Sequence, residues 1–192
     1  MHSIQNFVRK FNATDSSKKI KSFCCLLALL ALFLCSCSTK KKTLFSDLDP
    51  DDTGIKFRND LVETNDKNVL SYVYFYNGGG IAAGDLNNDG LADLIFTGKQ
   101  TGNKLYINKG NFDFEDICRA AGIESQNGWS TGVTLVDINS DGWNDIYICR
   151  SGDSEPNNRR NLLYINNHDQ TFTEKAASYG LDDTGYSTQS AF

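Results

Sequence analysis

The 192-residue sequence contains few of the residues on which several common functions depend. Of its two histidines, His2 lies in the N-terminal leader and His168 in a turn, so neither is repeated or paired with a nucleophile, which argues against a hydrolytic triad. The longest apolar run, the 12 residues from Phe23 to Leu34, is too short to cross a bilayer, which needs about 20. No stretch keeps a 3.6-residue period, so no long helix is expected.

Basic residues are also scarce, especially beyond the leader. Residues 1–36 carry five of the 19 Lys and Arg residues and one of the 24 Asp and Glu residues, which leaves 14 basic against 23 acidic residues from Cys37 onward. Affinity for nucleic acid depends on Lys and Arg that neutralise phosphates. An acidic chain without a basic stripe is therefore not expected to bind nucleic acid.

The N-terminus has the pattern of a lipoprotein signal peptide. A basic segment ending in "SSKKIKS" precedes the short apolar run, and "LCSCSTKKK" follows it. Leu34, Cys35 and Ser36 before Cys37 resemble a bacterial lipobox, so residues 1–36 are predicted to be removed and Cys37 to be lipidated. A lipid would tether the protein to a membrane without a transmembrane helix. The alternative is a soluble secreted protein in which this cysteine is incidental.

Two of the six cysteines, Cys118 and Cys149, lie in the repeated part of the chain. They could form a disulfide in an oxidising compartment. In the repeat alignment, however, they match Ala176 and Thr97, which favours two small buried residues.

Two short segments establish an internal repeat. "DLNNDGLAD" at residues 85–93 and "DINSDGWND" at residues 137–145 are 52 residues apart, and the later segments "NKLYINK" and "NLLYINN" are 58 apart. The six additional residues fall in the polar insertion "RSGDSEPNNRR". "GYSTQSAF" at the end of the chain matches "GWSTGVTL", so a third unit begins at residue 185.

Each unit has short β-rich runs bounded by Gly, Asn or Asp, which predicts about four strands and an all-β fold of β-propeller blades. In "SYVYFYNGGG" the alternation of Tyr72, Tyr74 and Tyr76 predicts a strand that ends at the glycines. The predicted divisions are a lipidated N-terminus, tether and entry segment at 37–70, blade 1 at 71–127, blade 2 at 128–184 and the start of blade 3 at 185–192. Because a propeller ring needs at least four blades, the chain is interpreted as the N-terminal piece of a longer protein.

The repeated loops are predicted to bind two structural calcium ions, because Ca²⁺ prefers oxygen ligands and a glycine permits the sharp turn. An EF-hand is excluded, since position 12 is Phe96 or Ile148 instead of Glu and the flanks are β-like. The alternative is a tight Asn/Asp-Gly turn without metal. The predicted ligands, with carbonyl oxygens from Leu91 and Trp143, are Asp85, Asn87, Asp89, Leu91 and Asp93 in the first loop and Asp137, Asn139, Asp141, Trp143 and Asp145 in the second.

The segments "GGGIAAGDLNNDGLADLIFTG" and "STGVTLVDINSDGWNDIYICRSG" resemble FG-GAP or VCBS-type repeats, the calcium-binding blades of integrin-α-like seven-bladed propellers. "NKLYINKGNFDFEDICRAAGI", "GWSTGV" and "NLLYINN" more narrowly resemble the cartilage-acidic-protein-like bacterial lipoproteins that carry an ASPIC/UnbV domain. That domain is not present in these 192 residues. The turns at Lys109–Asn111 and His168–Gln170 depart from the Gly-Asp-Gly of the family.

Together these features predict a calcium-stabilised β-propeller lipoprotein of the bacterial cell envelope, which acts as a binding or adhesion scaffold for a protein or glycan and touches the membrane only through its lipid. One alternative is the N-terminal part of an extracellular carbohydrate-active enzyme with catalytic residues beyond Phe192. Another is a purely structural spacer. The aromatic residues could stack on sugars, although packing between strands or blades is favoured. They are Tyr72, Tyr74, Tyr76, Trp129 and Tyr186.

Overall fold

The computed structural model describes residues 43–123 and 128–192. The predicted signal peptide, Cys37 and the first part of the predicted tether lie outside these ranges. Asp47–Phe192 form one compact unit, which contains every strand assigned within the described ranges. Within the described ranges, no helix has the length and apolar character required to span a membrane.

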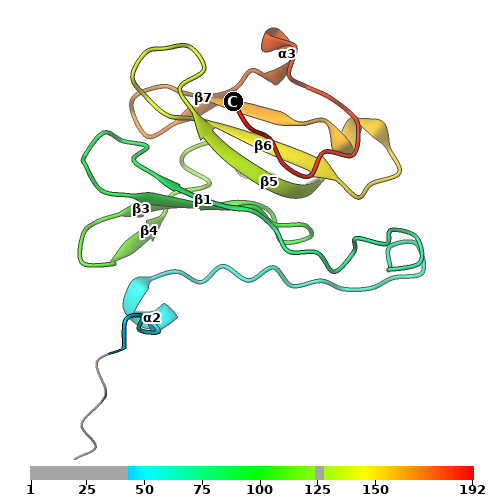
Figure 1. Cartoon of the computed structure of the whole chain (residues 1–192), viewed down its shortest axis with the longest axis horizontal. Helices are drawn as coiled ribbons and strands as arrows, with labels where there is room; N and C mark the ends of the chain where they lie inside the picture. Colours follow the sequence, from blue (N-terminus) through cyan, green and yellow to red (C-terminus); the bar gives the residue numbers. More distant parts are fainter. Residues whose placement is uncertain (1–42, 124–127) are drawn as a thin grey trace, which may run out of the picture. The chain divides into compact units, whose positions relative to one another are not determined.

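The compact unit contains two four-stranded antiparallel sheets, in each of which every strand pairs with the next one along the chain (Figure 1). The prediction of an all-β fold is therefore confirmed. The strands of the first sheet lie within the predicted blade 1, and those of the second sheet lie within the predicted blade 2. They are β1 (Ile81–Gly84), β2 (Asp93–Phe96), β3 (Lys104–Asn108), β4 (Phe114–Asp116), β5 (Trp129–Val136), β6 (Asp145–Ser151), β7 (Leu162–Asn166) and β8 (Phe172–Glu174).

The two sheets share the same pairing register. Leu94 faces Tyr106 across β2 and β3, and Ile146 faces Tyr164 across β6 and β7. These pairs are related by the offsets of 52 and 58 residues found in the sequence. The six-residue insertion lies between β6 and β7, where a single turn of 3-10 helix, η1 (Pro156–Arg159), accommodates part of it.

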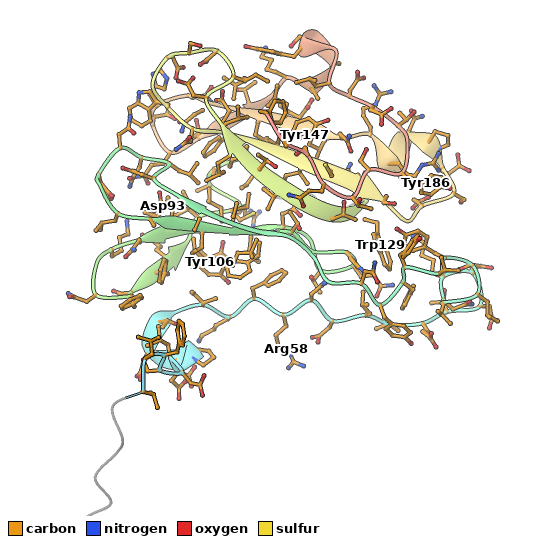
Figure 2. All side chains as sticks on the ribbon, viewed as in Figure 1. Arg58, Asp93, Tyr106, Trp129, Tyr147 and Tyr186 are labelled. Atoms are coloured by element: carbon orange, nitrogen blue, oxygen red, sulfur yellow. The ribbon has the colours of Figure 1, made fainter. Side chains whose placement is uncertain are left out.

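The main hydrophobic core lies between the two sheets, and a smaller cluster covers the other face of the second sheet. Both are made of alternate residues from neighbouring strands, as expected for sheets buried on both faces. The first cluster joins Ile95 and Leu105 to Ile146 and Ile148, and all four side chains are fully buried. The smaller cluster consists of Tyr147, which is labelled in Figure 2, together with Cys149, Leu163 and Ala176.

The N-terminal segment packs against the first sheet. Asp49 caps the N-terminus of the short helix α2 (Pro50–Thr53), because its carboxylate accepts a hydrogen bond from the Asp51 amide. This helix lies within a stretch predicted to be a tether. Further along, the Lys56 amide donates to the Tyr106 hydroxyl at 3.2 Å, and the Phe57 ring stacks on Phe96. Residues 50–57 are thus part of the folded unit.

The strand predicted at Tyr72–Tyr76 is wrong. These residues form turns, with the Phe75 amide donating to the Tyr72 carbonyl oxygen, and the first strand begins only after the glycines, at Ile81. The Asn68 side chain causes the difference, because its carboxamide oxygen accepts hydrogen bonds from the two amides that precede Tyr72. Phe75 is the buried residue of the segment.

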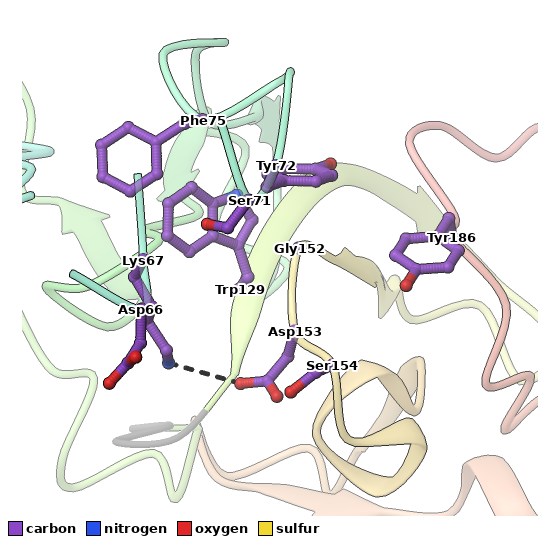
Figure 3. A pocket seen from close by; sticks show the side chains of 10 residues that line it. All are labelled: Asp66, Lys67, Ser71, Tyr72, Phe75, Trp129, Gly152, Asp153, Ser154 and Tyr186. Atoms are coloured by element: carbon purple, nitrogen blue, oxygen red, sulfur yellow. Dashed lines mark hydrogen bonds and ion pairs between the residues drawn. The ribbon is translucent and has the colours of Figure 1, made fainter. Parts of the chain in front are cut away.

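Of the five aromatic residues considered for sugar stacking, some are packed in the interior and others are exposed. Trp129 is buried, as the packing interpretation requires, and Tyr72 meets it edge to face (Figure 3). Tyr74, Tyr76 and Tyr186 are each more than half exposed. For these three residues the packing interpretation stays a prediction.

Cys118 and Cys149 are buried and are not joined by a disulfide. Cys118 Sγ lies 3.1 Å from the carbonyl oxygen of Asn103. Their repeat equivalents, Ala176 and Thr97, are also buried. The prediction of small interior residues is therefore confirmed.

The end of the chain is placed against the second sheet as β5 is placed against the first. The Ser130 amide donates to the Gly98 carbonyl oxygen, and the equivalent Ser187 amide donates to the Arg150 carbonyl oxygen. A Cβ atom on Gly132 would lie 2.6 Å from the Thr188 carbonyl oxygen, which repeats the relation of Gly80 to Thr131. Within the described part of the chain no strand is assigned to residues 185–192, and α3 (Ala176–Tyr179) leads into them.

Candidate functional site

The two acidic loops occupy equivalent positions in the two sheets. Residues 85–92 join β1 to β2, and residues 137–144 join β5 to β6. Gly90 and Gly142 adopt φ angles of 85° and 86°, a left-handed conformation that favours glycine. No heavy atom lies within 4 Å of a Cβ atom built at either position, so glycine is required there by backbone conformation and not by space.

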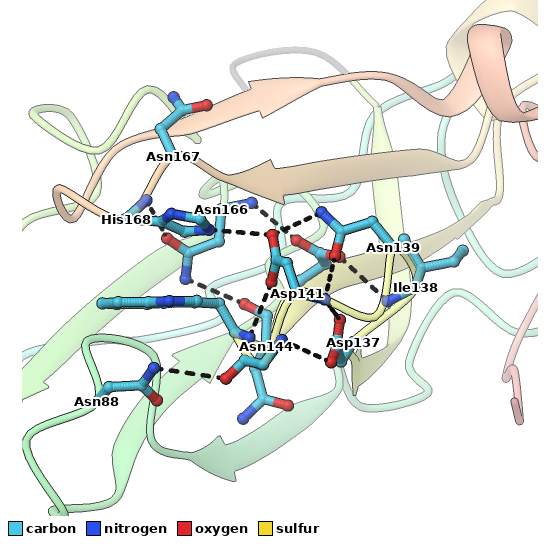
Figure 4. A network of polar contacts seen from close by, with 12 residues as sticks. Asn88, Asp137, Ile138, Asn139, Asp141, Asn144, Asn166, Asn167 and His168 are labelled. Carbon is cyan, nitrogen blue, oxygen red and sulfur yellow. Dashed lines mark hydrogen bonds and ion pairs between the residues drawn. The ribbon is translucent and has the colours of Figure 1, made fainter.

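In the second loop, polar side chains bind the backbone of their own turn (Figure 4). Asp137 accepts hydrogen bonds from the amides of Asp141 and Gly142 at 3.0 and 2.9 Å. Asn139 accepts from the Asp141 amide at 3.1 Å and donates its own side-chain N–H to the Asp141 carboxylate at 2.7 Å. The Trp143 amide donates to the same carboxylate at 2.9 Å. The turn is therefore held closed by its own Asp and Asn oxygens.

The first loop repeats this network. Asp85 accepts from the amides of Asp89 and Gly90, and Asn87 donates to the Asp89 carboxylate at 2.9 Å. The Leu91 amide donates to Asp89 at 2.8 Å. The structure thus brings the first three predicted side chains of each loop into one network. The carbonyl roles predicted for Leu91 and Trp143 stay predictions.

The last aspartate of each loop has different contacts. Asp93 and Asp145 are fully buried, and each accepts two backbone hydrogen bonds, one from the start of its loop and one from the adjacent strand. For Asp145 the donors are the amides of Ile138 and Asn166, at 3.2 and 2.8 Å. These carboxylates fasten the loop to β3 or β7.

Burial raises the pKa of Asp93 and Asp145 above the ordinary value, because a charged carboxylate loses hydration. The amide hydrogen bonds oppose the rise. The charges of Asp85 and Asp89 add to it for Asp93, so the carboxylates of a loop lie close enough to repel one another. A cation between them would relieve this repulsion.

The donors of the loops are hard oxygens, which is the ligand type that Ca²⁺ prefers. Within residues 43–123 and 128–192, however, no three His, Cys, Asp or Glu side chains gather in a group suited to holding a metal ion. The oxygens of Asp137 and Asp141 are directed toward loop amides. The chemistry of the set fits calcium, and binding itself stays a prediction.

Three asparagines that link the loops of the two sheets were not identified from the sequence. Asn144 Nδ2 donates to the Asp85 carbonyl oxygen at 2.9 Å, and Asn166 Nδ2 donates to the Leu86 carbonyl oxygen at 2.8 Å. A longer contact of 3.4 Å joins Asn88 Nδ2 to the Gly142 carbonyl oxygen. The repetition of asparagine at 108 and 166 in "LYIN" was the available signal, and the partners 59 and 80 residues away were not visible in sequence.

His168, expected only as a turn residue, contacts the second acidic loop. Its ring stacks on Trp143, with centroids 4.7 Å apart and planes inclined by 21°, and its Nε2 lies 3.0 Å from the Asp141 carboxylate. The first sheet has Gly110 at the equivalent position. The second loop therefore has an aromatic cover that the first loop lacks.

Two stacked sheets of identical register, each with an Asp/Asn/Gly loop between its first two strands, define a repeat domain of the β-propeller type. Residues 85–148 match the sequence model of the FG-GAP-like repeat. The chain therefore contains FG-GAP-like repeat sequence, and the resemblance drawn from its motifs is confirmed.

Two curated proteins show the same relationship. The chain is 38% identical to cartilage acidic protein 1 of Xenopus tropicalis over 72 residues. The matched region covers 37% of this chain and 11% of that protein. The chain is also 34% identical to integrin alpha-PS3 of Drosophila melanogaster over 83 residues. Here the matched region covers 38% of this chain and 7% of that protein. The matched region is thus a small part of each relative.

Proposed function

We propose that this protein is a calcium-stabilised binding scaffold of the β-propeller type, tethered to the cell envelope by a lipid on Cys37, with a protein or glycan as its partner. The observation that carries the proposal is the duplicated Asp/Asn network, which is joined across the two sheets by asparagine side chains. A scaffold needs loops held in a fixed position, and this network supplies them.

Within the scaffold, the oxygens of Asp85, Asn87 and Asp89 would hold the first ion and those of Asp137, Asn139 and Asp141 the second. Bound calcium supplies positive charge that offsets the carboxylates. Asp93 and Asp145 fasten each loop to a neighbouring strand through two backbone hydrogen bonds. Holding the loops fixed in advance reduces the entropy lost when a partner binds.

Thermal unfolding of the full chain in calcium, in magnesium and in chelator tests the calcium part. A ligand that binds only the folded state stabilises it by about 2.7 kcal/mol per site at a hundredfold excess over its dissociation constant. We expect calcium to raise the midpoint, and the double variant D89A/D141A to lose the increase. The exposed loop variant Asp113→Asn is the matched control and should keep it. A midpoint that is the same in calcium and chelator would refute the proposal.

The lipid anchor is tested by expression in a bacterial host supplied with labelled palmitate. The native chain should incorporate the label and partition with membranes, whereas Cys37→Ser should do neither. Cys35→Ser keeps Cys37 and is the matched control. The lipid tether would be refuted if the Cys37→Ser variant still incorporated labelled palmitate, or if the native chain incorporated none.

A further inference from the structure

A cavity of about 200 Å³ lies where three parts of the chain meet (Figure 3). The turn segment 66–75 forms one wall, Trp129 at the start of β5 forms the back, and the residues that follow β6 form the opposite wall together with Tyr186. Pockets for drug-sized ligands measure about 300 to 1,000 Å³. This cavity therefore has room for one small ring, or for the end residue of a longer chain.

The aromatic part of the cavity is held rigidly. Trp129 contacts the Phe75 ring at 5.2 Å and the Tyr72 ring at 5.8 Å between centroids. The Tyr72 hydroxyl lies 2.9 Å from Ser151 Oγ, which fixes the ring at its polar end. These side chains form a preorganised apolar wall, so little rotamer entropy would be lost on binding.

Tyr186 supplies an aromatic surface that a ligand can reach. The guanidinium of Arg159 lies 4.3 Å from the centre of its ring and covers one face. The residue is nevertheless 62% exposed, so the opposite face is accessible. An exposed ring beside a cavity can stack on an apolar ligand surface.

Trp129 also has a polar group without a partner. The residue is only 4% exposed, and its indole Nε1 has no hydrogen-bond partner among the described residues. The nitrogen is enclosed by the protein and is not a contact for a ligand in the cavity. Trp129 therefore contributes to the cavity as a buried aromatic wall.

The charges beside the cavity balance one another. Asp66 and Asp153 supply two carboxylates, Lys67 is paired with Asp153 at a distance of 3.4 Å, and the Arg159 guanidinium covers the Tyr186 ring. This balance favours neither an anion nor a cation, whereas the hydroxyl groups of an uncharged ligand can donate hydrogen bonds to the Asp66 carboxylate.

We propose that this cavity binds an uncharged sugar ring, the end residue of a glycan. The ring would stack on Tyr186, lie against the aromatic wall that includes Trp129, and donate a hydroxyl hydrogen bond to Asp66. The inference rests on the proposed scaffold function and identifies the glycan, and not a protein, as the partner at this position.

Intrinsic fluorescence tests the proposal, because the chain has only two tryptophans. In a Trp143→Phe background, Trp129 is the only indole reporter. The full chain is titrated with the methyl glycosides of glucose, galactose, mannose and N-acetylglucosamine. We expect at least one of them to change the Trp129 emission with saturation at one site.

Variants at exposed positions then locate the binding. Tyr186→Ala and Asp66→Asn should each weaken the binding about fivefold, which is the size expected for one aromatic or hydrogen-bond contact. Tyr179→Ala removes another half-exposed tyrosine, in α3 outside the cavity, and should leave the affinity unchanged. Both cavity variants lie on the surface, so their folding can be checked by an unchanged unfolding midpoint.

Two results would overturn the proposal: no glycoside of the panel alters Trp129 emission, or the change persists with equal affinity in both cavity variants. The calcium experiment separates this failure from failure of the scaffold. A calcium-dependent midpoint with no sugar response would remove only the glycan site. If the chain binds a sugar but its unfolding midpoint does not depend on calcium, the glycan site in the cavity would be supported and the calcium-stabilised scaffold would be refuted.

Discussion

Asn144 in the second sheet donates a hydrogen bond from its side chain to the backbone carbonyl oxygen of Asp85 in the first sheet, at 2.9 Å. Asp85 opens the first acidic loop, and Asn144 lies near the end of the second. One side chain therefore links the two predicted metal loops across the boundary between sheets.

Replacing Asn144 by alanine should lower the free energy of unfolding by about 1 kcal/mol, because the Asp85 carbonyl loses its partner. The loop itself should keep its conformation, since the first copy already has alanine at the equivalent position, Ala92. Urea unfolding of the full chain in chelator measures the difference. Asn65→Ala, at an exposed turn residue, is the control. Equal losses in the two variants would show that the link does not contribute.

Asp145 and Asp141 should respond differently to conversion into asparagine. The two oxygens of the buried Asp145 carboxylate each accept from one backbone amide, so Asp145→Asn places an NH₂ group against one of these two donors. We therefore expect a loss of about 2 kcal/mol even in chelator. Asp141→Asn keeps an oxygen for the Trp143 amide and should change the calcium-free stability little. Both should lose stabilisation by calcium. Equal behaviour of the two variants in chelator would contradict the separate roles of these carboxylates.

The loops and the equivalence of the strands in the two sheets could be predicted because they repeat in the sequence, whereas the strand order and the pairing register came from the structure. Two copies of Asp-x-Asn-x-Asp-Gly fix the turn, and the offsets of 52 and 58 residues fix equivalent strands. The turn at Tyr72–Tyr76 could not be predicted from alternation, since Asn68 captures two nearby amides. The asparagine links were hidden as well, because their partners come together only when the sheets stack.

Burial of Lys99 is another feature that the sequence did not indicate. The residue is 4% exposed, and its ammonium group donates to the Phe75 carbonyl oxygen at 2.8 Å and lies 4.9 Å from the centre of the Trp129 ring. Loss of hydration lowers its pKa from 10.5 to about 8. The folded protein therefore releases this proton at lower pH than the unfolded chain does.

The sign of the pH effect follows from that difference. Between pH 8 and 10.5 the unfolded chain binds more protons at Lys99 than the folded protein, so the contribution of Lys99 to stability rises with pH. We expect the unfolding free energy of the native chain, minus that of Lys99→Met, to increase across this window. Tyr147 and Cys149, whose pKa values are raised by burial, are common to both proteins and cancel. A constant difference would contradict the prediction.

The link between the loops also predicts that their ions bind with coupling. Trp143 lies only in the second loop, so sensitised emission of Tb³⁺, which replaces Ca²⁺ at oxygen sites, reports that loop when the indole is excited. Asp89→Ala in the first loop should weaken Tb³⁺ binding at the second about fivefold, at the lower end of typical coupling between sites. In an Asn144→Ala background the same change should have a much smaller effect, because the Asp85 carbonyl is no longer held. An effect of Asp89→Ala that is equal in both backgrounds would show that the coupling does not pass through Asn144.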